Sequence, residues 1–213
     1  FIENNKKRGK KVKKVKHSKS QGIELFFSIF IVLVYLGVIL FFLNEYNQKY
    51  HDYIKAKEEV FDNSIKDIFG TYEEFSNFIF KSEINRESVL SIIAQASNAD
   101  EEKKQELREN LYLKLKEVYG VTKEYNFRQL HFHLANGDSF LRFHSPEKYG
   151  DNLLDIRESI RIANEEKRYV SGFEEGRIFN GYRYVYPLSY EGKHIGSVEI
   201  SISMACLIEE LYK

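Results

Sequence analysis

The chain has 213 residues, 43% apolar and 15% aromatic, and its 32 basic and 32 acidic residues cancel to a formal net charge of zero. This apolar content excludes disorder throughout, and the single cysteine, Cys206, excludes an internal disulfide framework and a multi-cysteine zinc site. Residues 1–24 carry nine basic and two acidic side chains, a charge of +7, while the remainder carries 23 and 30, a charge of −7. This division excludes a uniform soluble globule. Because the chain begins at Phe1 instead of Met, we expect a fragment of a longer protein.

An uncharged apolar run of nineteen residues extends from Leu25 to Leu43. At about 1.5 Å of rise per residue, a helix of this length spans roughly 28 Å, close to the hydrocarbon thickness of a bilayer. A secretory signal peptide usually has a shorter apolar stretch and a small-residue cleavage site, which residues 41–44 do not offer. A buried core helix would show a polar face. We therefore predict a transmembrane helix over residues 23–44.

The basic residues predict the orientation of this helix. Lys and Arg are retained on the cytoplasmic side, so we expect residues 1–22 inside and the rest of the chain outside. A basic run alone could bind nucleic acid, but beside an apolar span it is better explained as a topology signal that also contacts the lipid bilayer. We expect no nucleic-acid partner. For a bacterium, which the Lys, Asn, Ile, Phe and Tyr bias suits, this is the inner (plasma) membrane with a periplasmic outer part.

Residues 45–120 are predicted to be a helical stalk that leads into the outer domain. Up to residue 119 they contain no Pro and only one glycine, Gly70. Apolar side chains recur at helical spacing, first at Val60, Ile68, Tyr72, Phe75 and Ile79, and then at Leu107, Leu111, Leu115 and Val118. We predict one long helix followed by shorter ones, with a stop at Gly120. The stripe would pack on a sheet or on a second copy of the chain, which favours a homodimer.

After Gly120 the apolar period changes to two, which indicates strands. Asn136-Gly137 predicts a hairpin turn, since this dipeptide tolerates positive φ at both central positions. A two-residue loop there pairs His133 with Phe140, His131 with Arg142, and Gln129 with His144. One face is then apolar, with Leu130, Phe132, Leu134, Leu141 and Phe143. The other is polar and basic, with Gln129, His131, His133, Phe140, Arg142 and His144.

A helix and three strands are predicted next. Asp151 is a good N-cap for a helix that ends near Lys167, with Leu153, Ile156, Ile160 and Ala163 as its apolar stripe and with Arg157 and Arg161 one turn apart. The strands are Tyr169–Arg177, Tyr182–Tyr190 and His194–Ser203. A Glu191-Gly192 loop pairs Tyr186 with Ser197 and Tyr184 with Glu199, which gives a second polar face, rich in tyrosine. Residues 204–213 begin another helix.

The predicted fold class is therefore α+β. The predicted elements begin and end with a hairpin, which implies a PAS-like module over residues 121–213. This module is a five-stranded antiparallel sheet with a long N-terminal helix, and it follows one transmembrane helix.

The segment from Leu130 to Ser203 resembles the double Cache sensor domains of bacterial transmembrane receptors. The resemblance lies in SFLR-x-H at Ser139–His144, P-E-K-x-G-D at Pro146–Asp151, the helix bearing Arg157 and Arg161, SG-x-E at Ser171–Glu174, and GKHIGSVE at Gly192–Glu199. A double Cache domain continues into a second, membrane-proximal module and a second membrane span, and neither is visible before Lys213. Either the fragment stops inside the domain or the module is single.

The resemblance implies a receptor that binds a small molecule outside and signals to a cytoplasmic output domain, in the first place a histidine kinase, otherwise a chemotaxis or diguanylate cyclase region. The residues support an anionic or zwitterionic ligand. Arg142, with Arg157 or Arg161, would clamp a carboxylate. His131, His133 and His144 would add hydrogen bonds, Tyr182, Tyr184 and Tyr186 would form walls, and Glu199 would hold an ammonium group or neutralise an arginine. Arg142 and His144 on an exposed sheet face, or Arg157 and Arg161 on a solvated helix side, are the structural alternatives.

Other classes are disfavoured by the sequence. His131, His133 and a third histidine suggest zinc, since alternate strand residues share a face, but no carboxylate falls obviously into register with them. We therefore expect no metal and no cofactor. Ser171, Gly172 and Glu174 lack a paired histidine base, and no nucleophile elbow or phosphate loop is present, so we expect no catalytic residues in this segment. A metal-binding hydrolase-like domain and a membrane-anchored structural dimerisation module remain the alternatives.

Overall fold

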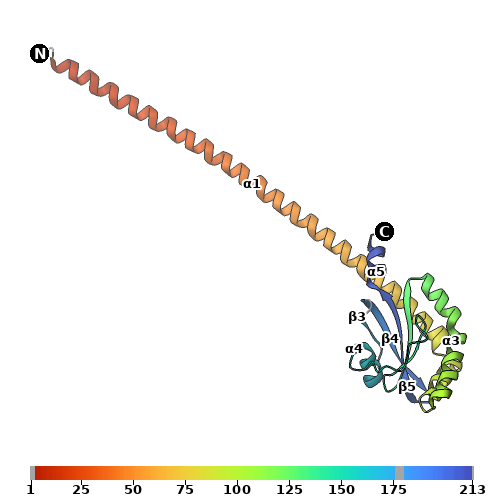
Figure 1. The fold of residues 1–213 in the computed structure, drawn as a ribbon. Helices are drawn as coiled ribbons and strands as arrows, with labels where there is room; N and C mark the ends of the chain where they lie inside the picture. Colours follow the sequence, from red (N-terminus) through yellow and green to blue (C-terminus); the bar gives the residue numbers. More distant parts are fainter. Residues whose placement is uncertain (1–2, 176–179, 213) are drawn as a thin grey trace. The chain divides into compact units, whose positions relative to one another are not determined.

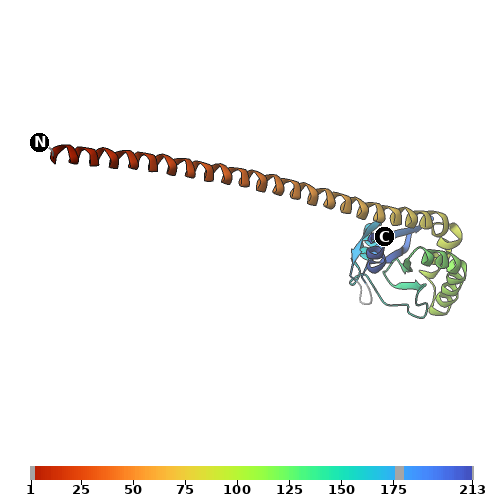
Figure 2. The ribbon, with the colours of Figure 1, turned by 90° about the horizontal axis from the view of Figure 1, so that it is seen from above.

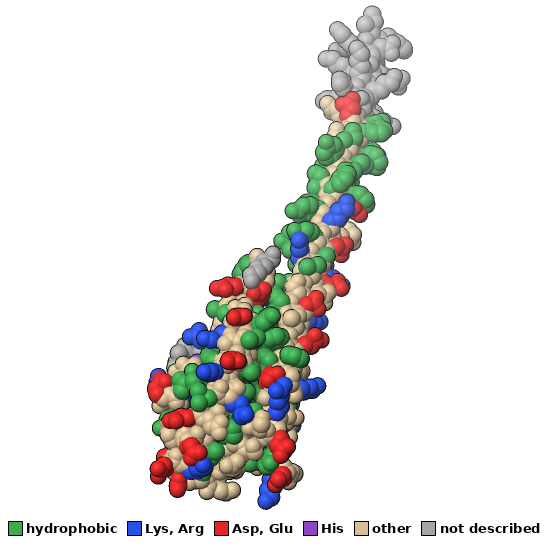
Figure 3. Space-filling view, turned by 90° about the vertical axis from the view of Figure 1, so that its right-hand side faces the viewer, with side chains coloured by type: hydrophobic (Ala, Val, Ile, Leu, Met, Phe, Trp, Pro, Cys, Tyr) green, Lys and Arg blue, Asp and Glu red, His purple; other side chains and the backbone are tan. Residues whose placement is uncertain are grey.

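The computed structural model describes residues 3–175 and 180–212, and it divides into two compact units, residues 1–62 and 63–213. The first unit belongs to helix α1 (Glu3–Ile79), which continues into the second. Side chains from Leu25 to Leu43 are all exposed, and Figure 3 shows a stretch of hydrophobic side chains along this helix. Among the described residues, one helical stretch is long and apolar enough to cross a membrane.

Four helical segments precede the sheet in the second unit. The end of α1 is followed by the π-helical turn η1 (Phe80–Ile84), α2 (Glu87–Ala96) and α3 (Glu101–Glu124). The Asp100 carboxylate caps α3 by accepting a 2.9 Å hydrogen bond from the backbone N–H of Lys103. Figure 2 shows α2 and α3 together at one side of this unit.

The predicted stop of α3 at Gly120 is wrong. The helix continues to Glu124, and Asn126 follows in the left-handed region at φ 65°. A glycine inside a helix costs only about 1 kcal/mol relative to alanine, which tertiary packing of the helix outweighs. Asparagine is one of the few residues that adopt left-handed backbone after a helix, so it provides the stop instead.

Five antiparallel strands form one sheet in the order β2-β1-β5-β4-β3. They are β1 (Phe127–Leu134), β2 (Ser139–Arg142), β3 (Val170–Glu174), β4 (Gly181–Tyr190) and β5 (Lys193–Ser203). Two short helical turns, α4 (Glu158–Arg161) and η2 (Ile162–Glu166), precede β3, and α5 (Met204–Leu211) follows β5. The predicted α+β class and five-stranded sheet are confirmed. The end of the strand predicted for Tyr169–Arg177 lies outside the described residues.

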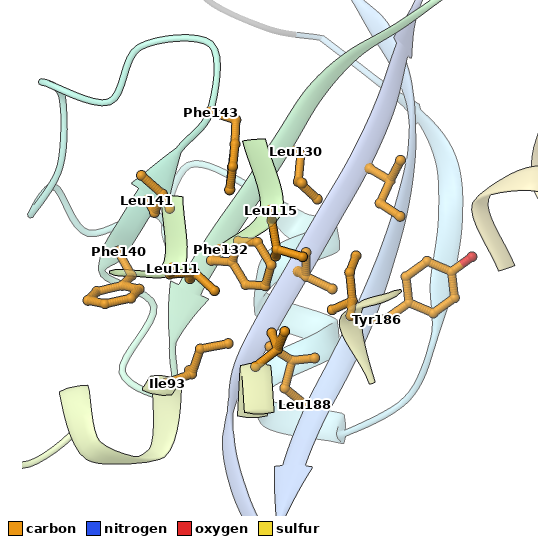
Figure 4. Close-up of a cluster of buried hydrophobic side chains, with 14 of the residues drawn as sticks. Ile93, Leu111, Leu115, Leu130, Phe132, Phe140, Leu141, Phe143, Tyr186 and Leu188 are labelled. Carbon is orange, nitrogen blue, oxygen red and sulfur yellow. The ribbon is translucent and has the colours of Figure 1, made fainter. Parts of the chain in front are cut away.

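The sheet is covered on both sides, as α3 and α4 show in Figure 1. We call the side toward α2, α3 and the end of α1 the helix face, and the side toward α4 and η2 the cavity face. The helix face carries the main hydrophobic core, drawn in Figure 4. Its strand residues include Leu130, Phe132, Tyr184, Tyr186, Val198 and Ile200. The cavity face carries Gln129, His131, His133, Arg183, Ser197, Glu199 and Ser201, which alternate with them along the same strands.

The first hairpin keeps only part of its predicted register. His131 pairs with Arg142 as predicted, but an irregularity in the β1–β2 ladder pairs His133 with Ser139 instead of Phe140. Phe140 therefore belongs to the core, where it is 1% exposed, and not to the polar face. The ladder stops at Arg142, so the predicted pair of Gln129 and His144 does not form.

The second hairpin is shifted by one residue from its prediction. Tyr190 pairs with Lys193 across the turn, but a bulge between Leu188 and Ser189 makes Val185, not Tyr184, the partner of Glu199. Gly196 lies at this bulge with φ +148°, and a Cβ added to it would lie 2.1 Å from the carbonyl oxygen of His133. Only a glycine at this position permits β5 to approach the backbone of β1 so closely. Because side chains alternate, the shift of one residue moves each side chain of β4 to the face opposite the predicted one.

The helix predicted from Asp151 to Lys167 begins only at Glu158. Residues 151–157 are irregular because their polar groups bind elsewhere. The Asp151 carboxylate bonds Arg142, and the Asn152 amide donates to the Asn136 carbonyl and to Asp138 at 2.8 and 2.9 Å. Of the predicted apolar stripe, Leu153, Ile160 and Ala163 are buried, whereas Ile156 is exposed. The Asp151 carboxylate therefore binds Arg142 instead of capping a helix.

Candidate ligand-binding site

A cavity of about 450 Å³ opens on the cavity face of the sheet. Strands provide part of its lining through Gln129, His131, Arg142, Arg183 and Glu199. The segment between β2 and α4, with the start of α4, provides the rest, including His144, Tyr149, Asp151, Leu153, Ile156, Arg157 and Ile160. This volume suits a small molecule, and the mixture of apolar walls with convergent polar groups is typical of a ligand site.

Arg142 enters the cavity from the last residue of β2. Its guanidinium donates two hydrogen bonds of 2.8 Å to the Asp151 carboxylate and a third of 2.9 Å to the Lys148 carbonyl. The Arg142 side chain is 15% exposed, whereas that of Asp151 is 53% exposed. Hydrogen bonding to Arg142 lowers the pKa of the Asp151 carboxyl. This fork is the geometry by which arginine binds any carboxylate, and here the loop itself supplies that group.

A chain of buried and half-buried charges crosses the cavity face from β5 to α4. Arg183 is 2% exposed and contacts Glu199, which is 1% exposed. The Arg183 Nε lies 3.0 Å from a Glu174 oxygen, and Arg157 lies 3.8 Å from the same atom. Glu174 also accepts hydrogen bonds of 3.1 Å from the backbone N–H and hydroxyl of Ser159. Each cation is matched by a carboxylate, as buried charges require.

Two buried histidines lie next to each other on β1. The ring centroids of His131 and His133 are 4.1 Å apart. Each ring has one nitrogen near a serine hydroxyl, His131 Nε2 at 2.8 Å from Ser139 and His133 Nδ1 at 3.0 Å from Ser197. The other nitrogen of His133, Nε2, is buried and has no hydrogen-bond partner among the described residues.

Burial governs the protonation of these groups. Burial is the main cause that lowers the pKa of His133 to about 4 and that of His131 well below 6.5, and the positive charge of Arg142 contributes to both shifts. Burial, with Arg142, also lowers the pKa of His144. For Glu199, burial alone would raise the pKa, but Arg183 and His133 lower it below its usual value. The face therefore presents neutral imidazoles beside an ionised carboxylate at neutral pH.

Five of the ten residues predicted for the ligand site line the cavity, namely His131, Arg142, His144, Arg157 and Glu199. His133 does not line it and lies behind His131. Arg161 is outside, where it forms hydrogen bonds of 2.8 Å to Glu158 and Glu165 on its own helical segment. The remaining three, Tyr182, Tyr184 and Tyr186, lie on the helix face, because the bulge at Gly196 reverses β4 relative to the prediction.

The tyrosines contact the end of α1 and η1 instead of the cavity. The Tyr186 hydroxyl is 2.9 Å from the Ser76 hydroxyl, and its ring stacks on Phe80 with centroids 4.3 Å apart. Tyr182 packs on Phe69 at a centroid distance of 4.4 Å, and the Tyr184 hydroxyl lies 3.4 Å from the Phe69 carbonyl.

The sequence interpretation missed Arg183, Asp151 and Gln129 as cavity residues. Arg183 alternates with Tyr182 and Tyr184, so the signal for it was present, but the assumed register assigned it to the wrong face. The sequence interpretation also found no carboxylate in obvious register with the histidines, and this premise is wrong: Glu199 pairs directly with His131 across β1 and β5. A pairing of strands so distant in sequence has no local signal.

An antiparallel sheet with long helices on one face and a polar cavity on the other is the architecture of PAS-like sensor domains. The family model described as a double sensory domain of two-component sensor kinase, dCache_3, matches residues 58–213. The chain belongs to this family, which confirms the Cache resemblance. No curated protein matches the sequence.

Three solved sensor-domain structures are similar to this chain at low sequence identity, and the first of them shows the same fold. The sensor domain of the Vibrio cholerae histidine kinase DctB is 13% identical, with a TM-score of 0.61 over 78% of this chain and 61% of that domain. The Escherichia coli DcuS sensor domain is 11% identical, with a TM-score of 0.46 over 62% of this chain and 89% of that one. The Campylobacter jejuni chemoreceptor Tlp3 with isoleucine bound is 16% identical, with a TM-score of 0.43 over 73% and 64%. The chain thus spans about three-fifths of the DctB domain.

Proposed function

We propose that this chain is the extracytoplasmic sensor region of a membrane receptor and that it binds a small carboxylate-bearing ligand, anionic or zwitterionic, in the cavity. The observation that carries the proposal is the Arg142 fork, which already holds one carboxylate, that of Asp151, with two bonds of 2.8 Å. Asp151 belongs to an irregular segment and is half exposed, so a ligand carboxylate can replace it on the half-buried guanidinium of Arg142.

Charge balance at the cavity supports a ligand of this kind. Arg142, Arg157 and Arg183 line the cavity, and so do Asp151 and Glu199. Once the ligand carboxylate displaces Asp151 from Arg142, the Asp151 carboxylate is available to an ammonium group of the ligand. The Glu199 carboxylate also lines the cavity and can accept an ammonium group there. His131 and His144 add hydrogen-bonding groups that stay neutral near pH 7, because burial lowers the pKa of each.

Strand β4 gives a route from the cavity to α1. Arg183 faces the cavity, while its neighbours Tyr184 and Tyr186 contact Phe69, Ser76 and Phe80 on the opposite side. A ligand that displaces Asp151 changes the charges around Arg183 and shifts β4, and the tyrosines pass the shift to α1. Displacements of one or two ångströms are the usual scale of helix-shift signalling.

We propose that residues 23–44 cross the membrane, with the basic residues 1–22 in the cytoplasm, the stalk and module of residues 45–213 outside, and a homodimer as the signalling unit. The output is a cytoplasmic histidine kinase, in line with the family description. In a Cys206→Ser background, Ser64→Cys should react with an impermeant maleimide on intact cells and Ser18→Cys should not. The reverse labelling would contradict this orientation.

Calorimetric titration of the whole chain in detergent against a panel of small mono- and dicarboxylates and amino acids tests ligand binding. Arg142→Ala should weaken binding about tenfold to a hundredfold, since a charged hydrogen-bond pair contributes about 1.5–3 kcal/mol. Arg161→Ala is the matched control, because Arg161 lies outside the cavity. Equal binding by Arg142→Ala would remove Arg142 from the site. A panel without any binder would favour a structural dimerisation module.

A further inference from the structure

A second site lies in the sheet itself, where β1 and β5 meet. His131, His133 and Glu199 are all buried, and one potential ligand atom from each lies within 4.8 Å of the others. The two histidines are two residues apart on one strand, and Glu199 is the direct cross-strand partner of His131. Two imidazoles and a carboxylate on one face are the donor set of many transition-metal sites.

The hydrogen bonds around the cluster leave ligand atoms available. Ser139 and Ser197 each bond one nitrogen of a histidine, at 2.8 and 3.0 Å. This is the outer-shell support that orients metal-bound imidazoles. The His133 Nε2 atom is buried without a partner among the described residues, an arrangement that a bound metal would explain.

The surrounding charges are compatible with a cation. Arg183 contacts one oxygen of Glu199, and a carboxylate has a second oxygen that can bind a metal at the same time. The neighbouring arginines also contact other carboxylates, Arg142 that of Asp151, and Arg157 and Arg183 that of Glu174, so Glu199 is not their only counter-charge. His131 and Glu199 also line the cavity, so water or another small ligand can complete the coordination from that side.

We propose that His131, His133 and Glu199 form a binding site for a divalent transition metal of the zinc type. Zinc bonds of about 2.0–2.1 Å require ligand atoms roughly 3.3 Å apart. Side-chain rotations that move the three ligand atoms by about an ångström would bring them to this distance around the ion. His131 and Glu199 also line the ligand cavity, but the metal site does not depend on the carboxylate proposal, because metal binding needs neither Arg142 nor an organic molecule.

Metal titration of the whole chain in detergent, stripped with a chelator, tests the site. We expect one Zn²⁺ to bind per chain. One Co²⁺ should bind to the same site with a visible absorption band, and Zn²⁺ should displace it in a competition titration. His133→Gln and Glu199→Gln should each weaken Zn²⁺ binding at least a hundredfold, because loss of an outer-shell partner alone costs tenfold to a hundredfold. His51→Gln, which changes an exposed histidine of α1 outside the cluster, should bind like the unmodified chain.

Equal zinc affinity in His133→Gln and the unmodified chain, or no stoichiometric binding at all, would overturn the proposal. X-ray absorption of the zinc-loaded unmodified chain decides the matter if a variant does not fold. Two imidazoles and one carboxylate around the metal are expected, and a first shell with sulfur or fewer than two imidazoles would contradict it. Carboxylate titration of the chelated protein is a separate readout, so failure of either site leaves the other testable.

Discussion

Strands β1, β4 and β5 send alternate side chains to two faces that are equally buried but differently stabilised. On the helix face, Phe132 and Tyr184 are fully buried among apolar and aromatic neighbours. On the cavity face, Arg183 and Glu199 are just as inaccessible, at 2% and 1% exposure, but are paired with each other. Apolar burial stabilises in proportion to its area, whereas a buried ion pair stabilises little and is costly to break. The first face holds the domain together, and the second is available for binding.

The bulge at Gly196 decides which residues belong to which face, so Gly196→Ala should have the largest effect. An alanine Cβ would collide with the His133 carbonyl and would hold a backbone angle that L-residues rarely adopt. We expect a loss of about 5 kcal/mol or more in the free energy of unfolding, measured by urea titration with circular dichroism.

Gly172→Ala in β3 is the control for this glycine. A Cβ added at Gly172 meets nothing within 4 Å, so a change below about 1 kcal/mol is expected. Similar losses in the two variants would show that the bulge is not what specifies the faces.

Arg183→Met tests the ion pair of the cavity face. It leaves Glu199 buried without its cation, and we expect a loss of about 3–5 kcal/mol in the free energy of unfolding near pH 7. The double variant Arg183→Met with Glu199→Gln should be more stable than Arg183→Met alone, since the buried charge is then removed too. A double variant no more stable than the single one would mean that Arg183 acts through packing.

Acidification should destabilise the cavity face before the helix face. The folded-state pKa of His133 is about 4 and its ordinary value is 6.5, so the unfolded chain binds more protons between these values. Stability from this group is therefore complete above pH 6.5 and is lost as the pH falls toward 4, by up to about 3 kcal/mol. Unfolding of chelated protein from pH 7 to 4 measures the slope. His133→Gln should reduce it, and an unchanged slope would assign it to other groups.

Tyr186→Phe should have the smallest effect on the free energy of unfolding, and this effect comes from the contact between β4 and α1. It removes a hydroxyl that bonds Ser76 at 2.9 Å and Asn77 at 3.0 Å, so a loss of about 1 kcal/mol is expected. Tyr184→Phe is the matched control, because its hydroxyl lies a longer 3.4 Å from the Phe69 carbonyl. If both cost the same, the Ser76 contact has no special role in joining the sheet to α1.

Most of the fold could be read from the sequence, because its signals are local. The apolar run from Leu25, the helical spacing around Leu111 and Leu115, and the alternation in β1 each follow from the period of one element. The helix stop at Gly120 and the helix start at Asp151 failed for the same reason, since tertiary contacts override weak local preferences. The candidate site was harder, and five of its ten predicted residues do not line the cavity.

Alternation of polar and apolar residues along the strands follows from the sequence alone, because the two-residue period is a property of the extended backbone. Which of these residues contact each other depends on the packing of the whole sheet. The bulge at Gly196 needs the His133 carbonyl against it, and it places Arg183 instead of Tyr184 in the cavity. Likewise, β1 and β5 are joined by long-range pairing, which brings Glu199 opposite His131. Register differs by a single residue between the two arrangements, and only packing of the whole sheet selects one of them.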